Sequence, residues 1–146
     1  SNIWSEDKMG WVCQTYSSGG YSTKVVTEKY AASCPSGTLP QWDRLIFDST
    51  TPTGTSVRFG VRTAPASSPT AFTPASPTLA ASAPSTHPAK CTSGGPNPCP
   101  VDLYKLLGSV AAHQANLELT VTLEPSAQAA PTVSSWQITY SCPPKE

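Results

Sequence analysis

Several segments of this chain alternate apolar and polar residues one by one, and this alternation most constrains the fold. Residues 55–63 alternate around Val57, Phe59 and Val61, and residues 117–123 read Leu-Glu-Leu-Thr-Val-Thr-Leu. A β-strand sends successive side chains to opposite faces, so each segment has one apolar and one polar face. The pattern predicts an all-β fold, an antiparallel β-sandwich of the jelly-roll or Ig-like type.

Five segments are predicted as strands: 21–30, 42–48, 55–63, 117–123 and 133–142. Between the second and third lies Thr-Pro-Thr-Gly-Thr, a tight-turn sequence in which Pro52 presets φ and Gly54 accepts a positive φ. We therefore expect 42–48 and 55–63 to form a hairpin. In the last strand Trp136, Ile138 and Cys142 share a face, which directs Cys142 toward the core or a neighbouring strand.

A tract rich in Pro, Ser and Ala separates these strands. Within residues 64–90, Phe72 and Leu79 are the only sizeable apolar side chains. Because neither flank has enough strands to close a core by itself, we predict one domain over residues 1–146. In it, 1–20 is an irregular N-terminal segment, and 64–100 is a long extended crossover loop pinned by Phe72 and Leu79. One short helix is predicted near 101–107, with Pro100 in its first turn and Gly108 as its C-terminal cap.

The bulk composition excludes some classes of partner. The chain has 146 residues, with nine basic and nine acidic side chains, so its formal charge is zero. Nothing therefore draws it toward nucleic acid or an anionic membrane surface. No apolar run approaches the roughly 20 residues of a membrane span, so membrane insertion is not expected. The chain begins with Ser1 and not Met, which suggests a processed piece of a longer protein.

Five cysteines at this composition indicate an oxidising compartment. Cys91 and Cys99 enclose a turn-like Thr-Ser-Gly-Gly-Pro-Asn-Pro insert, so a local bridge is predicted there. For Cys34 the preferred partner is Cys142, because both flank strand ends. The alternative is a Cys13–Cys34 bridge, which leaves Cys142 free. Cys13 is thus either unpaired or the alternative partner of Cys34.

No group of residues has the spacing of a catalytic or metal site. The chain has no G-x-S-x-G sequence and no paired C-x-x-C spacing, and His87 and His113 stand in unrelated contexts. Glu118 and Glu124 share a strand face but lie about 20 Å apart, too far to flank one glycosidic bond. We expect them to be solvated sheet-face charges. The prediction is a protein that is not an enzyme, with no metal and no cofactor.

Two arginines on one strand have two interpretations. Arg58 and Arg62 lie on the polar face of 55–63, separated by Gly60. One interpretation is a shallow anion or sugar platform, with Gly60 leaving room for a ligand. The alternative, which we favour, is cross-strand pairing with acidic residues. The candidates are Asp43, Asp48, Glu118 and Glu124.

Aromatic residues gather near the N-terminus. Trp4, Trp11, Tyr16 and Tyr21 precede or flank a Ser-Ser-Gly-Gly loop. They are candidates for stacking on sugar rings. The alternative is that they plug the open end of the sandwich, which is the more frequent role of aromatics in this position.

A further set of stretches is similar to a known kind of module: Trp42, 51–64, 100–103, 117–119 and the closing Trp-Gln-Ile-Thr-Tyr-Ser-Cys at 136–142. On these stretches residues 30–142 resemble β-sandwich modules of large secreted and cell-surface proteins of myxobacteria and related bacteria. Some of these modules are attached to pilus-tip adhesin-like proteins. The matching motifs are structural, so the resemblance implies fold and location and carries over no active site.

These observations predict a non-catalytic, secreted bacterial surface module. It would serve adhesion or the structural assembly of a larger cell-surface protein, with flanking domains or neighbouring subunits as partners. The alternatives are a carbohydrate-binding module that recognises a glycan, and a subunit of an extracellular filament or pilus-associated complex that pairs along an open sheet edge.

Overall fold

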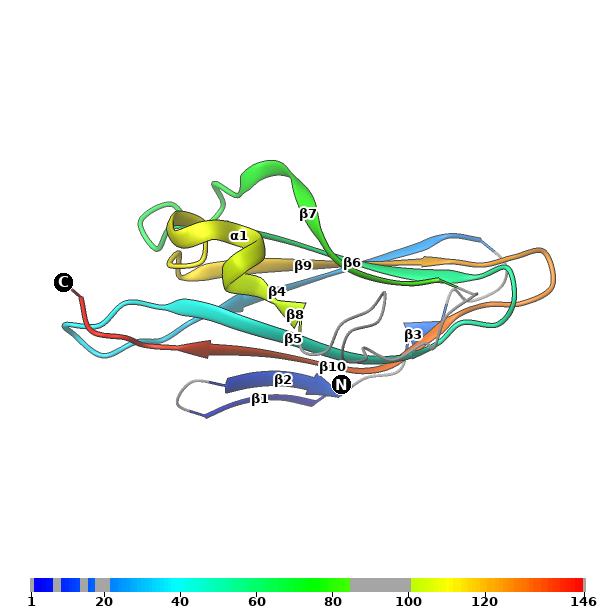
Figure 1. Ribbon diagram of the computed structural model, residues 1–146, viewed down its shortest axis with the longest axis horizontal. Helices are drawn as coiled ribbons and strands as arrows, with labels where there is room; N and C mark the ends of the chain where they lie inside the picture. Colours follow the sequence, from blue (N-terminus) through cyan, green and yellow to red (C-terminus); the bar gives the residue numbers. More distant parts are fainter. Residues whose placement is uncertain (1, 7–8, 14–15, 18–21, 85–100, 146) are drawn as a thin grey trace.

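The computed structural model describes residues 2–6, 9–13, 16–17, 22–84 and 101–145, and for residues before 22 the backbone alone. Within these ranges the chain is mostly β, with two antiparallel sheets and one short helix. The two sheets lie face to face as layers, and the helix lies at one end of them (Figure 1). The predicted all-β sandwich is confirmed at this level.

The first sheet has the strand order β1-β2-β10-β5-β8, and β3 pairs beside β2 on β10. Its strands are β1 (Asn2–Glu6), β2 (Met9–Cys13), β3 (Tyr16–Ser17), β5 (Gln41–Thr50), β8 (Val101–Asp102) and β10 (Thr132–Ser141). The second sheet has the order β4-β9-β6-β7. Its strands are β4 (Lys24–Ala31), β6 (Ser56–Ala64), β7 (Thr73–Pro84) and β9 (Asn116–Glu124).

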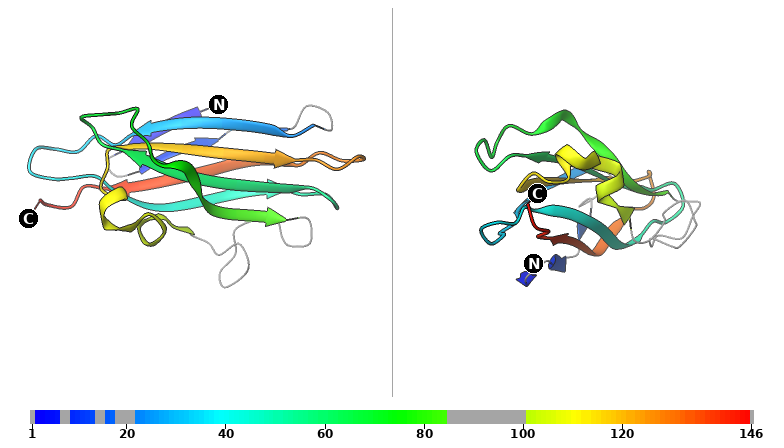
Figure 2. Two further views of the ribbon diagram at one scale, coloured as in Figure 1. Left: turned by 90° about the horizontal axis from the view of Figure 1, so that it is seen from above. Right: turned by 60° about the vertical axis from the view of Figure 1, so that its left-hand side comes forward.

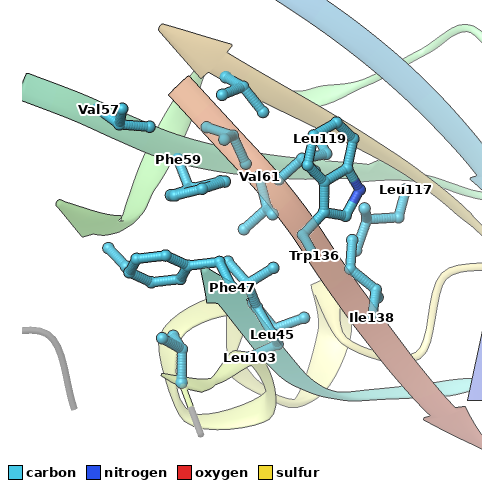
Figure 3. Packing of buried hydrophobic residues seen from close by; sticks show 14 of the residues in the cluster. Leu45, Phe47, Val57, Phe59, Val61, Leu103, Leu117, Leu119, Trp136 and Ile138 are labelled. Carbon is cyan, nitrogen blue, oxygen red and sulfur yellow. The ribbon is translucent and has the colours of Figure 1, made fainter. Parts of the chain in front are cut away.

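The core lies between the two sheets and follows the alternation of the sequence. On β6 the side chains of Val57, Phe59 and Val61 are fully buried, while Arg58 between them is exposed. Phe47 of β5 meets Phe59 across the layers, with ring centroids 4.5 Å apart (Figure 3). Burial of these faces removes apolar surface from water, which is the main favourable term in folding.

All five predicted strands are present. The largest shift of a boundary is at the start of β4, which begins at residue 24 instead of 21. The predicted hairpin between 42–48 and 55–63 is wrong. β5 pairs with β10 and β8, whereas β6 pairs with β9 and β7. The connection is a tight turn, with Thr55 N–H donating to Pro52 O at 2.9 Å and Gly54 at φ +85°, but it crosses from one sheet to the other.

Part of the expected crossover loop is a regular strand. Residues 73–84 form β7, which pairs with β6 at the edge of the second sheet. The three prolines of this segment are tolerated because an edge strand has one side without ladder hydrogen bonds. Phe72 is half-buried and holds the preceding loop, but Leu79 is 55% exposed, so it does not pin the tract. Residues 85–100 lie outside the described ranges.

The helix begins two residues later than predicted and ends later. It is α1 (Leu103–Ala111), and its N-cap is Asp102, whose Oδ1 accepts from Lys105 N–H at 3.0 Å. Gly108 has φ +86°, so the predicted stop at this glycine appears as a break inside the element, after which a further turn runs to Ala111. Leu103 is fully buried and docks the helix on the core.

A disulfide joins Cys34 and Cys142, as the strand ends predicted, with Cα atoms 5.6 Å apart. It links the segment after β4 in the second sheet to the segment after β10 in the first, so it clasps the two layers at one end. The alternative Cys13–Cys34 bridge is therefore excluded. Cys13 belongs to β2, and the predicted Cys91–Cys99 bridge lies outside the described residues. Among those residues no helix is long and apolar enough to cross a membrane.

Candidate functional site

In the described part of the chain, the end of the sandwich that carries the disulfide is built from four connecting segments together with the starts of β5 and α1. Two of the connecting segments directly follow the bonded cysteines in the chain: residues 35–40 follow Cys34, and residues 143–145 follow Cys142. These two segments pair with each other. Leu39 N–H donates to Pro143 O at 3.0 Å, and Lys145 N–H donates to Gly37 O at 2.9 Å. The chain end and the β4–β5 connection lie together there, next to α1 (Figure 2). The disulfide thus fixes the place of Lys145.

The other two segments are residues 112–115, between α1 and β9, and residues 65–66, which follow β6. Trp42 holds the first of these from inside. Its backbone N–H donates to Ala112 O at 2.9 Å, and its indole Nε1–H donates to Gln114 O at 2.7 Å. A buried indole normally finds such a partner. The 112–115 segment therefore has a backbone position set by the core.

His113 stands in the middle of this end. Its Nδ1 lies 2.9 Å from Pro40 O, and because a carbonyl oxygen only accepts, Nδ1 carries the proton. Its ring meets that of Tyr104 edge-on, at 5.6 Å between centroids. His113 is thus half-buried and held on two sides.

Two hollows open on either side of His113. One, of about 260 Å³, lies among Leu39, Pro65, Gln114 and Lys145. The other, of about 380 Å³, lies among Leu39, Gln41, Tyr104 and the prolines at 143–144. Both are lined by Leu39 and His113. We refer to them together as the end site.

Sequence reasoning missed the end site. Lys145, Gln114 and Tyr104 belong to no motif and lie far apart in the chain. The available signal was indirect: residues 35–40 and 143–145 directly follow the two cysteines predicted to pair, so the bridge had to bring these segments together.

The outer face of the second sheet holds the two arginines of β6, each in a cross-strand ion pair. Arg58 lies 3.2 Å from Glu124, and Arg62 Nε donates to Glu118 at 2.7 Å. Of the two interpretations, the pairing with acids on a neighbouring strand is present. Glu124 also accepts from Ser56 Oγ at 2.8 Å.

Glu118 is not a solvated charge, since only 6% of the residue is exposed. Lys29 and Arg62 flank it in the sheet register, and the Phe72 ring, from the loop before β7, lies 5.2 Å from the Arg62 guanidinium and 5.7 Å from Lys29 Nζ. Arg62 Nη1 also donates to Ala75 O at 2.7 Å. Buried charges in proteins are normally paired in this way, and the pair ties the loop to the sheet.

A shallow hollow of about 220 Å³ lies over Gly60 on the same face, beside Arg58, Leu79 and Thr120. Gly60 makes room mainly for the neighbouring strand, because a Cβ there would lie 2.8 Å from Cβ of Pro77. Arg58 keeps 57% of its side chain exposed. A ligand platform at Arg58 and Arg62 stays a prediction.

The prediction of an irregular N-terminal segment over 1–20 is wrong where the structure describes it, because pairing with β10 adds β2 and β3, and through β2 also β1, to the first sheet. The described N-terminal aromatics fall on these strands. Trp4 and Trp11 are direct partners in the β1–β2 ladder. Tyr16 lies in β3 opposite Val133, and Tyr21 is outside the described residues. Their part in sugar stacking stays a prediction, as does their part in plugging the sandwich.

Within the described ranges no three His, Cys, Asp or Glu side chains gather where they could hold a metal ion. No family model matches the chain, and neither a curated protein nor a solved structure is significantly similar to it.

Proposed function

We propose that the chain is a non-catalytic extracellular module for adhesion or for the structural assembly of a larger cell-surface protein. The observation that carries the proposal is the Cys34–Cys142 disulfide, which joins the two layers covalently at one end of the sandwich. Disulfides of this kind persist in oxidising compartments. The two ion pairs of the second sheet support the non-catalytic part of the proposal, because Glu118 and Glu124 are each paired with an arginine.

The location is part of the proposal. The low share of charged residues, 12%, and the resemblance of residues 30–142 to secreted bacterial modules support an extracellular place. The partners would be flanking domains or neighbouring subunits of the same surface assembly.

The fold type is proposed to be a jelly roll. In the order β4 to β10, every connection changes sheet except that between β6 and β7. Strand order β2-β10-β5-β8 in one sheet and β4-β9-β6-β7 in the other is the order of two interlocked Greek keys. Jelly rolls occur in lectin and capsid domains, but such a fold supports no function by itself.

The test combines location with adhesion. Intact cells of the producing organism are treated with an external protease and probed for the chain. In parallel, beads coated with purified chain are tested for binding to those cells, with reduced and alkylated chain as the control. We expect external cleavage and binding by the oxidised chain only. Full protection from protease, or hydrolytic activity that one Ser, His or acid substitution abolishes, would contradict the proposal.

A carbohydrate-binding module is the second candidate. It is favoured by the register of β1 and β2, which makes Trp4 and Trp11 neighbours across the ladder. Two adjacent aromatic residues on one strand pair suit stacking on sugar rings, where a flat apolar face meets CH groups. Glycan binding that is unchanged in Trp4→Ala and Trp11→Ala would remove these residues as the platform.

A filament subunit is the third candidate, and the edge position of β4 favours it. β4 pairs only with β9 in the described part of the chain, and its eight residues contain no proline. An open edge of this kind is a template for strand addition. Sedimentation at high concentration would show assemblies that Val26→Pro disperses; monomer alone at every concentration would count against this candidate.

A further inference from the structure

We infer that the end site binds a carboxylated sugar unit of an acidic polysaccharide. The inference deepens the proposed function, because it names the ligand class of the surface module. Its basis is the charge and the hydrogen-bonding character of the residues around His113.

Charge is the first step. Lys145, an exposed cation, lines the hollow of about 260 Å³, and no Asp or Glu lines either hollow among the residues that the structure describes. Two described acids lie two residues away from lining residues: Asp43 from Gln41, and Asp102 from Tyr104. Each already accepts a hydrogen bond at 3.0 Å, Asp43 from Gln41 Nε2 and Asp102 from Lys105 N–H. A cation with no acid among the described residues that line its hollow attracts an anion.

Hydrogen-bonding capacity is the second step. Since His113 Nδ1–H is used by Pro40 O, its Nε2 is the ring nitrogen that can accept from a ligand hydroxyl. One end of the Gln114 side-chain amide lies 2.9 Å from Thr63 Oγ1, which leaves the other end for a ligand. A cation, a ring acceptor and an amide together match a ligand that carries both a carboxylate and hydroxyl groups. They do not match a bare inorganic anion, which presents acceptors only.

Shape is the third step, and it favours a sugar over an acidic peptide. The walls contain Pro40, Pro65 and the prolines at 143–144, which have no N–H to offer. The N–H groups of Leu39 and Lys145 are already bound within the wall. An extended peptide therefore has little backbone to pair with. The apolar faces of Leu39, Tyr104 and the proline rings instead suit the CH face of a sugar ring.

The disulfide should influence the site, because Lys145 follows Cys142 by three residues and its segment, 143–145, pairs with residues 37–39. Reduction frees this tail from its anchor. Binding should therefore weaken on reduction even where the sandwich stays folded.

The experiment is a titration of the oxidised full chain with trigalacturonic acid, in which binding is measured by calorimetry and by changes in amide NMR shifts. Trigalactose serves as the neutral match and a short polyglutamate peptide as the acidic one. We expect binding of the uronide alone, with shifts concentrated at residues 38–41, 113–115 and 145. Lys145→Ala should weaken binding at least five-fold, whereas Lys105→Ala, on the exposed surface of α1 at the same end, should leave it unchanged.

Four results would overturn the inference: no uronide binding, equal binding of trigalactose, equal binding of polyglutamate, or equal loss in Lys145→Ala and Lys105→Ala. Its failure is distinguishable from failure of the proposed function. If coated beads still adhere to cells but the chain does not bind the uronide, the inference fails and the proposed surface module is retained. If the chain binds the uronide but is fully protected from external protease, the proposed function fails and the ligand assignment is retained.

Discussion

The two ion pairs on the outer face of the second sheet differ in how much water reaches them. Arg62 and Glu118 have side chains that are 24% and 8% exposed, whereas those of Arg58 and Glu124 are 57% and 35% exposed. Removal of one partner from a buried pair leaves an uncompensated charge, while exposed pairs contribute little.

Arg62→Ala should therefore lower the free energy of unfolding by roughly 3 kcal/mol. The matched change Arg58→Ala should lower it by less than about 1 kcal/mol. Urea denaturation of both variants measures the difference. Equal losses would mean that the loop with Phe72 does not shield Glu118.

Gly60 is a second position where a single added atom should change the stability of the fold. Gly60→Ala places a methyl group 2.8 Å from Pro77 Cβ and should destabilise the fold by about 1–3 kcal/mol. Pro77→Gly in the same chain removes the opposing atom, so the two changes should be less than additive. Strict additivity in the double-mutant cycle would show that this contact is not the cause.

At this scale the sequence was informative where chemistry is local. The pairing of Cys34 with Cys142 followed from their positions at strand ends, and the arginine–glutamate pairs followed from polar strand faces. The burial of Glu118 could not be predicted, because its neighbours Arg62 and Lys29 are in turn packed against Phe72, which comes from the loop between β6 and β7.

At the scale of the elements, the sequence predicted which segments form strands, but it did not predict which strands pair with one another. Alternation shows that a segment has one buried face, and both β5 and β6 have one. It does not show which sheet the segment joins, since both sheets turn apolar faces to the same core. The hairpin prediction failed for this reason. β7 escaped prediction because its Pro, Ala and Ser residues have low strand propensity, and tertiary pairing with β6 overrides it.

The break inside α1 offers a test at the level of the element. Gly108 has φ +86° and ψ 166°, a region essentially restricted to glycine that costs a residue with a Cβ about 1–3 kcal/mol. Gly108→Ala should reduce the stability by about this amount, whereas Ser109→Ala, at the neighbouring exposed position, should change it little. Thermal unfolding of both variants checks the difference. Stabilisation by Gly108→Ala would mean that α1 prefers to be continuous.

The molecule as a whole is two layers clasped at one end, and the end site exists because segments far apart in the chain meet there. No local pattern announces such a site, which explains why the sequence pointed to the N-terminal aromatics and to Arg58 and Arg62 instead. The clasp itself was foreseeable, and the loops that it brings together were not.

Loss of the clasp should be costly. The bridge spans a sequence separation of 108 residues, and closing so long a loop removes about 4–5 kcal/mol of chain entropy from the unfolded state. Cys142→Ser should lower the free energy of unfolding by about this amount, and adding Cys34→Ser should lower it little further. A much larger second loss would show that Cys34 has another partner.

Disulfide mapping of the chain taken from its producing cells tests the central claim most directly. Non-reducing proteolysis and mass spectrometry should yield one linked pair of peptides that contains Cys34 and Cys142 in nearly all molecules. Free thiols at both positions, or Cys34 linked to Cys13, would contradict the clasped sandwich and with it the extracellular role.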